Sequence, residues 1–208
     1  MSKKLVYLIL LMCANFFFAQ QNDEFRSAKD YFDYQRFMLN NEFKKKFDNE
    51  KNIDQKIAIK RDFSEFMVKL DSIQNTAFIG TLIKVKNRED LEKITVKNLP
   101  ELHLNPKKED LNKEAQYPGG FEMLRKQVAD LFYTDSVLPD QKLLKANVVF
   151  VVGKDGSIGN VHAEGDNFTF NRQAEIAMYL LPEKFSPAII NGTAVRYRFR
   201  LPLSMTFD

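Results

Sequence analysis

The sequence predicts an α+β protein, with a small three-stranded antiparallel sheet, two helices on one face of it, and an N-terminal helical region before it. Residues 194–207 alternate apolar and polar side chains without a break, as a strand with one buried face does. The pair Asp155-Gly156 separates two strand-like runs and is typical of a tight hairpin. Residues 22–91 contain one glycine and no proline, and their apolar residues recur at helical spacing.

Residues 1–20 are typical of a secretory signal peptide. Two lysines precede the apolar run Leu5–Met12, and polar residues follow Ala19, near which we expect cleavage. The alternative is a short, uncleaved inner-membrane anchor, but the apolar run is shorter than the roughly 20 residues that a spanning helix needs. The only cysteine, Cys13, lies in this segment, so a processed chain would contain no disulfide. We therefore expect an exported, periplasmic protein.

Residues 21–91 form the predicted helical region, with two or three helices in a hairpin or small bundle. Two apolar stripes at helical spacing predict its core, Phe25, Phe32, Leu39, Phe43 and Phe47 in the first and Ile53, Ile57, Phe63, Phe66, Met67, Leu70, Ile73 and Ala77 in the second. Residues 92–113 hold Pro100, Pro106 and a charged run, and they predict a linker.

Residues 114–208 predict a second domain in the order helix, strand, strand, helix, strand. A helix is expected at 121–132 after a Pro-Gly-Gly turn, and strands at 143–152 and 158–164 flank the Asp-Gly hairpin. A second helix is expected at 171–181, where Pro182 ends it, and Asn191-Gly192 turns the chain into the final strand. This order gives a small antiparallel sheet under two helices.

Catalytic chemistry is not predicted. The two histidines, His103 in the linker and His162 on a strand, lack a nucleophile or a second ligand nearby, and Glu164 and Asp166 are best explained as a charged turn. The formal net charge of +3 is too small to favour nucleic-acid binding. We expect a protein that is not an enzyme and takes no metal, cofactor or small-molecule substrate.

The last strand is the candidate site because its sequence predicts the edge of a sheet. Pro202 has no N–H for a ladder and suits an edge better than a centre. Arg196, Arg198 and Arg200 line the polar side of the strand. Such a strand either resists edge-to-edge aggregation or accepts another chain by strand addition, and the sequence leaves both roles open.

The C-terminal part, about residues 114–208, resembles the TonB C-terminal domain family. The resemblance rests on an ordered set of short motifs, which are Tyr117-Pro118-Gly119-Gly120, the valine-rich strand 148–152 with Asp155-Gly156, the helix ending at Pro182, Phe185-Ser186-Pro187-Ala188, Asn191-Gly192, and the strand that contains Leu201-Pro202-Leu203. Phe185 and Ala188 stand where the family often has Trp and Gly. A charged helical region replaces the proline-rich spacer of the force-transmitting members.

The resemblance implies a non-enzymatic module that grips an extended segment of an outer-membrane transporter, or of a related envelope protein, by β-strand addition. The expected partner-binding residues are Val195, Arg196, Tyr197, Arg198, Phe199, Arg200 and Leu201. One alternative is an inner-membrane-anchored energy transducer. Another is a structural envelope protein that forms a homodimer through its own last strand.

Overall fold

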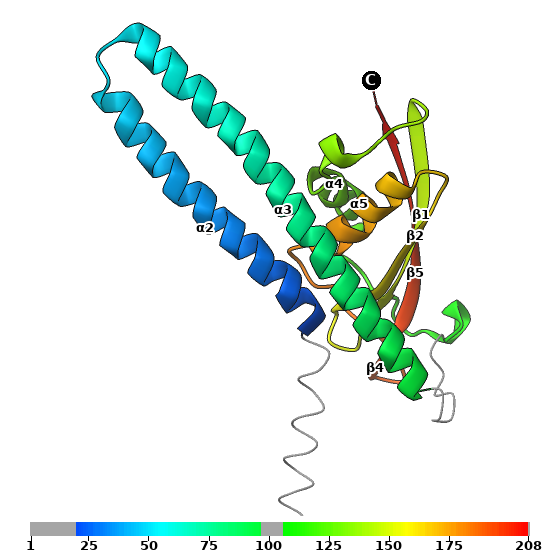
Figure 1. Cartoon of the computed structure of the whole chain (residues 1–208). Helices are drawn as coiled ribbons and strands as arrows, with labels where there is room; N and C mark the ends of the chain where they lie inside the picture. Colours follow the sequence, from blue (N-terminus) through cyan, green and yellow to red (C-terminus); the bar gives the residue numbers. More distant parts are fainter. Residues whose placement is uncertain (1–19, 97–105, 208) are drawn as a thin grey trace, which may run out of the picture.

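The computed structural model describes residues 20–96 and 106–207, and it begins with a long helical hairpin (Figure 1). Helix α2 spans Gln20–Asn49 and helix α3 spans Ile53–Val96. Asn52 caps α3, because its side-chain oxygen accepts from the backbone N–H of Asp54 at 2.8 Å. The predicted helical region is therefore a two-helix hairpin, and α3 runs past the expected end of that region at residue 91.

The sheet domain confirms the predicted fold class. Its elements are α4 (Gly120–Asp130), β1 (Leu143–Val152), β2 (Ile158–Glu164), α5 (Phe168–Tyr179), the short strands β3 (Ala188–Ile190) and β4 (Thr193–Val195), and β5 (Tyr197–Thr206), with the short 3-10 helices Lys108–Asp110 and Thr134–Ser136. The main sheet is antiparallel in the order β2–β1–β5, and β3–β4 is a separate hairpin. Asn191 and Gly192 both have positive φ, so their predicted turn is the type that two-residue hairpins favour.

Helices α4 and α5 lie on one face of the sheet, and the helical hairpin packs against α5 (Figure 1). Along β1 the buried residues alternate with exposed or half-buried ones, and the buried set is Leu144, Ala146, Val148, Phe150 and Val152. On the opposite face Val149 and Val151 are half-buried and lie opposite Arg200 and Arg198 of β5. The continuous apolar run in β1 therefore has one deeply buried side, not two.

The predicted final strand is wrong in one respect, because it is broken at Arg196. Residues 193–195 pair with 188–190 in the β3–β4 hairpin, and β5 begins only at Tyr197. The reason is the length of β1. Tyr197 pairs with Val152, the last residue of β1, so residues before Tyr197 have no β1 partner left.

Both helices of the sheet domain differ from the expectation by one to three residues at each end. Helix α5 begins at Phe168, three residues earlier than expected, because Asn167 caps it and accepts from the N–H of Phe170 at 2.9 Å.

Of the predicted linker, residues 97–105 lie outside the described part of the chain, and so does His103. Lys113, near its end, already bridges to Ile189 beside the β3–β4 hairpin.

The base of the hairpin and the sheet domain share one hydrophobic core. Phe25 of α2 stacks on Tyr179 of α5, with ring centroids 5.2 Å apart, and Leu82 and Val85 of α3 join the same cluster. Gln173 of α5 donates to Asn75 of α3 at 2.8 Å in this buried contact. Burial of this apolar surface fixes the hairpin on the sheet domain.

The apolar stripes of the hairpin are buried only in part. Phe25, Phe32 and Leu70 are buried, but Ile53, Ile57, Phe66 and Ile73 of the second stripe are exposed, so this part of the predicted core is wrong.

Among the described helices, none is both long and apolar enough to cross a membrane, and residues 1–19, where the signal peptide or anchor is predicted, lie outside the described part.

The Asp155-Gly156 turn packs against the segment after α5. Gly156 has φ +79°, and its carbonyl accepts from the N–H of Phe185 at 3.0 Å. A Cβ at this position would lie 1.9 Å from the carbonyl oxygen of Phe185. Only glycine therefore satisfies both the turn and the close approach.

We predict that Gly156→Ala lowers the free energy of unfolding by about 3 kcal/mol, since it adds a backbone clash to a strained φ. The matched control is Gly192→Ala, where φ is +76° but a Cβ meets nothing within 4 Å, so the loss is about 1 kcal/mol. Urea unfolding of both variants measures the difference, and equal losses would contradict the packing role of Gly156.

Candidate functional site

The two edges of the main sheet have different surroundings, and this difference defines the candidate site. The outer edge of β2 is closed by side chains from the helices. The N–H of Asn160 donates to Glu89 at 2.6 Å, the N–H of Val161 to the Tyr179 hydroxyl at 3.2 Å, and the N–H of Ala163 to Glu175 at 2.9 Å. An incoming strand would find these three donors already occupied.

Glu89 and Tyr179 form the buried centre of this closure. The Tyr179 hydroxyl donates to the Glu89 carboxylate at 2.7 Å, and both side chains are almost fully buried. Burial raises the pKa of Tyr179 well above its ordinary value, with the Glu89 charge adding to the effect, so the hydroxyl keeps its proton. Burial also raises the pKa of Glu89, although the bonds from Tyr179 and Asn160 and the charges of Lys93 and Lys86 oppose it.

Glu175 closes the next part of the β2 edge. Its carboxylate forms an ion pair with Lys86 of α3 at 2.6 Å and is buried. His162 lies on the exposed face of β2, 3.4 Å from both Glu164 and Glu175. Within the described residues no group of three or more acidic, histidine or cysteine side chains is arranged to hold a metal ion.

The register of the sheet shows which backbone groups of β5 point outward. Ala163 directs its N–H away from the sheet, so its partner Val148 directs its own backbone groups to β5. Val148 pairs with Leu201, which therefore bonds inward. Because alternate residues point to opposite sides, Arg198, Arg200 and Pro202 direct their backbone groups to the outer edge.

Pro202 occupies a position where its missing N–H removes no bond to β1. No other described strand pairs with the outer side of β5, so the backbone groups of Arg198 and Arg200 remain available there. The edge-strand prediction for β5 and Pro202 is therefore consistent with the sheet topology.

The predicted partner-binding residues divide between two strands. Val195 lies in β4 and pairs with Ala188, and Arg196 lies at the break between β4 and β5. Residues 197–201 lie together on β5, where Phe199 and Leu201 are buried in the core and Tyr197 is half-buried. The side chains of Arg198 and Arg200 are exposed on the uncovered face of the sheet.

Helix α4 borders the open edge on the other face. Phe121 is 44% exposed and its ring centroid lies 6.0 Å from that of Phe199. A cavity of about 730 Å³ lies near the second half of β5, with Leu203 and Met205 of β5 and Arg125 of α4 in its lining. An extended chain along β5 would thus meet an apolar surface on one side and arginines on the other.

The residues of the TonB-like motifs gather at one end of the sheet. Tyr117 is buried against Phe185, with ring centroids 4.9 Å apart, and Gln116 exchanges backbone bonds of 2.8 and 3.1 Å with Ser186. Gly119 and Gly120 have positive φ at the start of α4, and Phe185 also contacts Phe150 and Phe199. Pro118 and Pro182 are exposed, and Pro187 is half-buried, in the connecting segments. Tyr117 and Phe185 are therefore core residues, whereas Pro118, Gly119 and Pro182 are exposed.

No family model matches the chain, and neither a curated protein nor a solved structure is significantly similar to it.

Sequence reasoning missed Glu89, Glu175 and Tyr179, which close the β2 edge. One signal was present for Glu89, because it lies four residues after the buried Val85 on the same helical face. An acidic side chain on an apolar stripe is seldom buried without a partner. The partner itself, the backbone of β2, is not visible in the local sequence.

We predict that the stability of the fold falls as pH rises from about 4.5, the ordinary pKa of Glu89, through its raised value in the folded protein. The folded state holds the Glu89 proton more tightly than the unfolded state does. The contribution of Glu89 to the free energy of unfolding is therefore complete below its ordinary pKa and lost above its raised pKa. In urea unfolding at a series of pH values, Glu89→Gln should flatten the slope of the free energy of unfolding against pH. The control is Glu92→Gln, because Glu92 is exposed on the same helix. An unchanged slope in Glu89→Gln would contradict the assignment.

Proposed function

We propose that this chain is a non-enzymatic periplasmic protein of the TonB C-terminal type, which binds outer-membrane transporters or related envelope proteins by strand addition to β5. The observation that carries the proposal is the asymmetry of the sheet edges. Side chains of Glu89, Tyr179 and Glu175 occupy the donors of β2, whereas Arg198 and Arg200 present backbone groups at an edge that no described strand covers.

Backbone hydrogen bonds would supply the affinity. An extended segment beside β5 would bond the N–H and C=O groups of Arg198 and Arg200, and it would find no donor at Pro202. The contact therefore centres on the first half of β5, which is the part of the strand where the core residues Phe199 and Leu201 hold the backbone in place.

Side chains would supply the selectivity. Successive side chains of an added strand alternate between the two faces of the sheet. One set would lie beside the exposed guanidinium groups of Arg198 and Arg200, and the other toward α4 and the exposed part of Phe121. A segment that alternates acidic and apolar residues fits both faces, and the arginines would also speed its association at low salt.

We predict that Arg200→Pro weakens binding of transporter-derived peptides by more than tenfold, because it removes an outward N–H while leaving the ladder to β1 intact. The matched variant Arg200→Ala keeps that N–H and removes only the charge, so we expect a two- to fivefold, salt-dependent loss. Isothermal titration gives both affinities, and backbone amide shifts of the unaltered chain locate the peptide.

The proposal predicts shifts along residues 197–201. Peptide at millimolar concentration that leaves these amides unmoved would overturn it, and so would equal losses in Arg200→Pro and Arg200→Ala. Self-pairing of β5 between two copies, the alternative role of this edge, predicts instead that dilution of the chain alone moves the same amides.

The periplasmic location rests on residues 1–20. We predict that mass spectrometry of the chain recovered from cells finds a mature N-terminus at Gln20 or Gln21, where the polar sequence begins. An intact N-terminus would favour the alternative of an inner-membrane-anchored energy transducer, in which α2 follows the anchor directly.

A further inference from the structure

The outer half of the helical hairpin has only a half-buried contact between its two helices, in which Phe43 of α2 stacks on Phe63 of α3 with ring centroids 4.1 Å apart. Between Phe32 and Leu70 no side chain is buried, although this stretch is fully described and contains many large apolar residues. Figure 1 shows that this half projects beyond the sheet domain, so α5 cannot cover it. A helical hairpin of this length gains most of its stability from packing of an apolar face.

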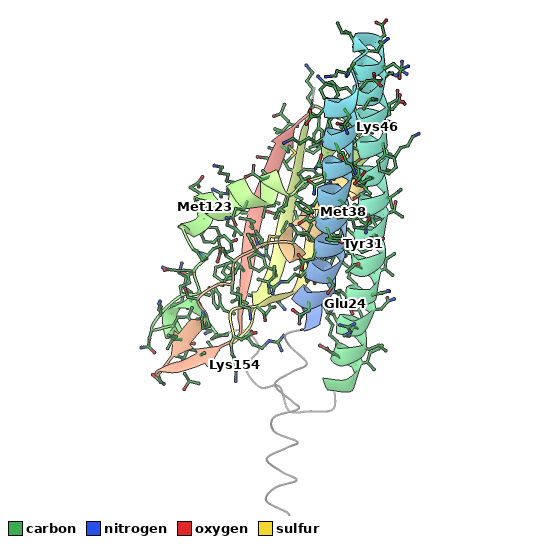
Figure 2. All side chains as sticks on the ribbon, turned by 90° about the vertical axis from the view of Figure 1, so that its left-hand side faces the viewer. Glu24, Tyr31, Met38, Lys46, Met123 and Lys154 are labelled. Carbon is green, nitrogen blue, oxygen red and sulfur yellow. The ribbon has the colours of Figure 1, made fainter. Side chains whose placement is uncertain are left out.

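Helix α2 carries a second apolar stripe on the side away from α3. Tyr31, Tyr34, Phe37 and Met38 follow one another at helical spacing, and their exposed fractions are 59%, 59%, 61% and 44%. The buried residues Phe25 and Phe32 point to the opposite side, toward α3 and α5. Figure 2 looks onto this outer side of α2 and shows Tyr31 and Met38 along it.

The size of the stripe is in the range of a functional patch. Three aromatic side chains of about 150–250 Å² each and one methionine, all near half exposed, present on the order of 400 Å². A stable interface buries about 800 Å² per partner, so the stripe supplies roughly half and the polar side chains around it the rest.

The charges around the stripe match a second copy in the antiparallel direction. Along α2, residues 20–40 carry four acidic and three basic side chains, and residues 42–49 carry two acidic and three basic ones. Asp30 and Lys45 are both exposed, and they lie at equal distances from the midpoint between Phe37 and Met38. A two-fold axis at that midpoint would pair each Asp30 with the Lys45 of the other copy.

We propose that two copies of this chain associate through the outer face of α2, antiparallel and centred on Phe37 and Met38, so that the two α2 helices pack against each other with one α3 on each outer side. The arrangement buries both aromatic stripes against each other and brings the more basic tip of each hairpin against the more acidic base of the other. It goes beyond the function proposed for β5 and leaves that edge free in both copies.

Sedimentation equilibrium of the full chain tests the proposal. We expect a dimer with a dissociation constant in the micromolar range, and at least a tenfold weakening by Phe37→Asp. The matched control is Ile83→Asp, which places the same charge at a 55% exposed apolar position of α3 outside the interface and should leave the dimer unchanged. Circular dichroism confirms that both variants remain folded.

An exchange of charges distinguishes the loss of this specific interface from a general loss of packing. Asp30→Lys and Lys45→Asp should each weaken the dimer three- to tenfold, and the double variant should restore it. Met38→Cys, in a Cys13→Ser background, should cross-link two copies on oxidation, because position 38 lies beside the axis. Ile83→Cys in the same background should not.

The proposal is overturned by a chain that stays monomeric at several hundred micromolar, or by a dimer that Phe37→Asp leaves intact. It is also overturned if the double charge exchange fails to restore association. Binding of monomeric chain to phosphatidylglycerol vesicles, abolished by Phe37→Asp, would assign the stripe to a lipid surface instead.

Discussion

One buried carboxylate, Glu89, joins the helical hairpin to the sheet, and the different surroundings of the two sheet edges depend on it. It accepts from the backbone of Asn160 at the β2 edge and from the hydroxyl of Tyr179 on α5. These bonds satisfy polar groups that would otherwise be buried without partners. Together with the bonds from Val161 to Tyr179 and from Ala163 to Glu175, they occupy N–H groups that an added strand would otherwise use.

The long helical region therefore has a structural task within the sheet domain as well as a surface of its own. Its base contributes Phe25, Leu82 and Val85 to the common core, and α3 supplies the carboxylate that closes β2. Its outer half lies beyond that core and displays aromatic side chains to solvent. The two halves of one hairpin thus lie in different environments.

Much of the fold was predictable because its signals are local. Gly156, Asn191 and Gly192 adopt positive φ angles at the turns, and the strands beside Asp155-Gly156 have the predicted bounds. Predictions were wrong where a distant element decides the outcome. The last strand breaks at Arg196 because β1 ends at Val152, and Ile53, Ile57, Phe66 and Ile73 of α3 stay exposed because the sheet domain does not extend to cover them.

The sequence by itself determined the fold class, the turns, and the alternation that places the arginines of β5 on one face. Only the tertiary structure decided which sheet edge is open, because that depends on contacts such as the one between Glu89 and Asn160, which are 71 residues apart. It also decided which apolar residues of the hairpin have a core to enter. Periodicity states which side of a helix is apolar, but burial requires a second surface, and the position of that surface is a property of the whole fold.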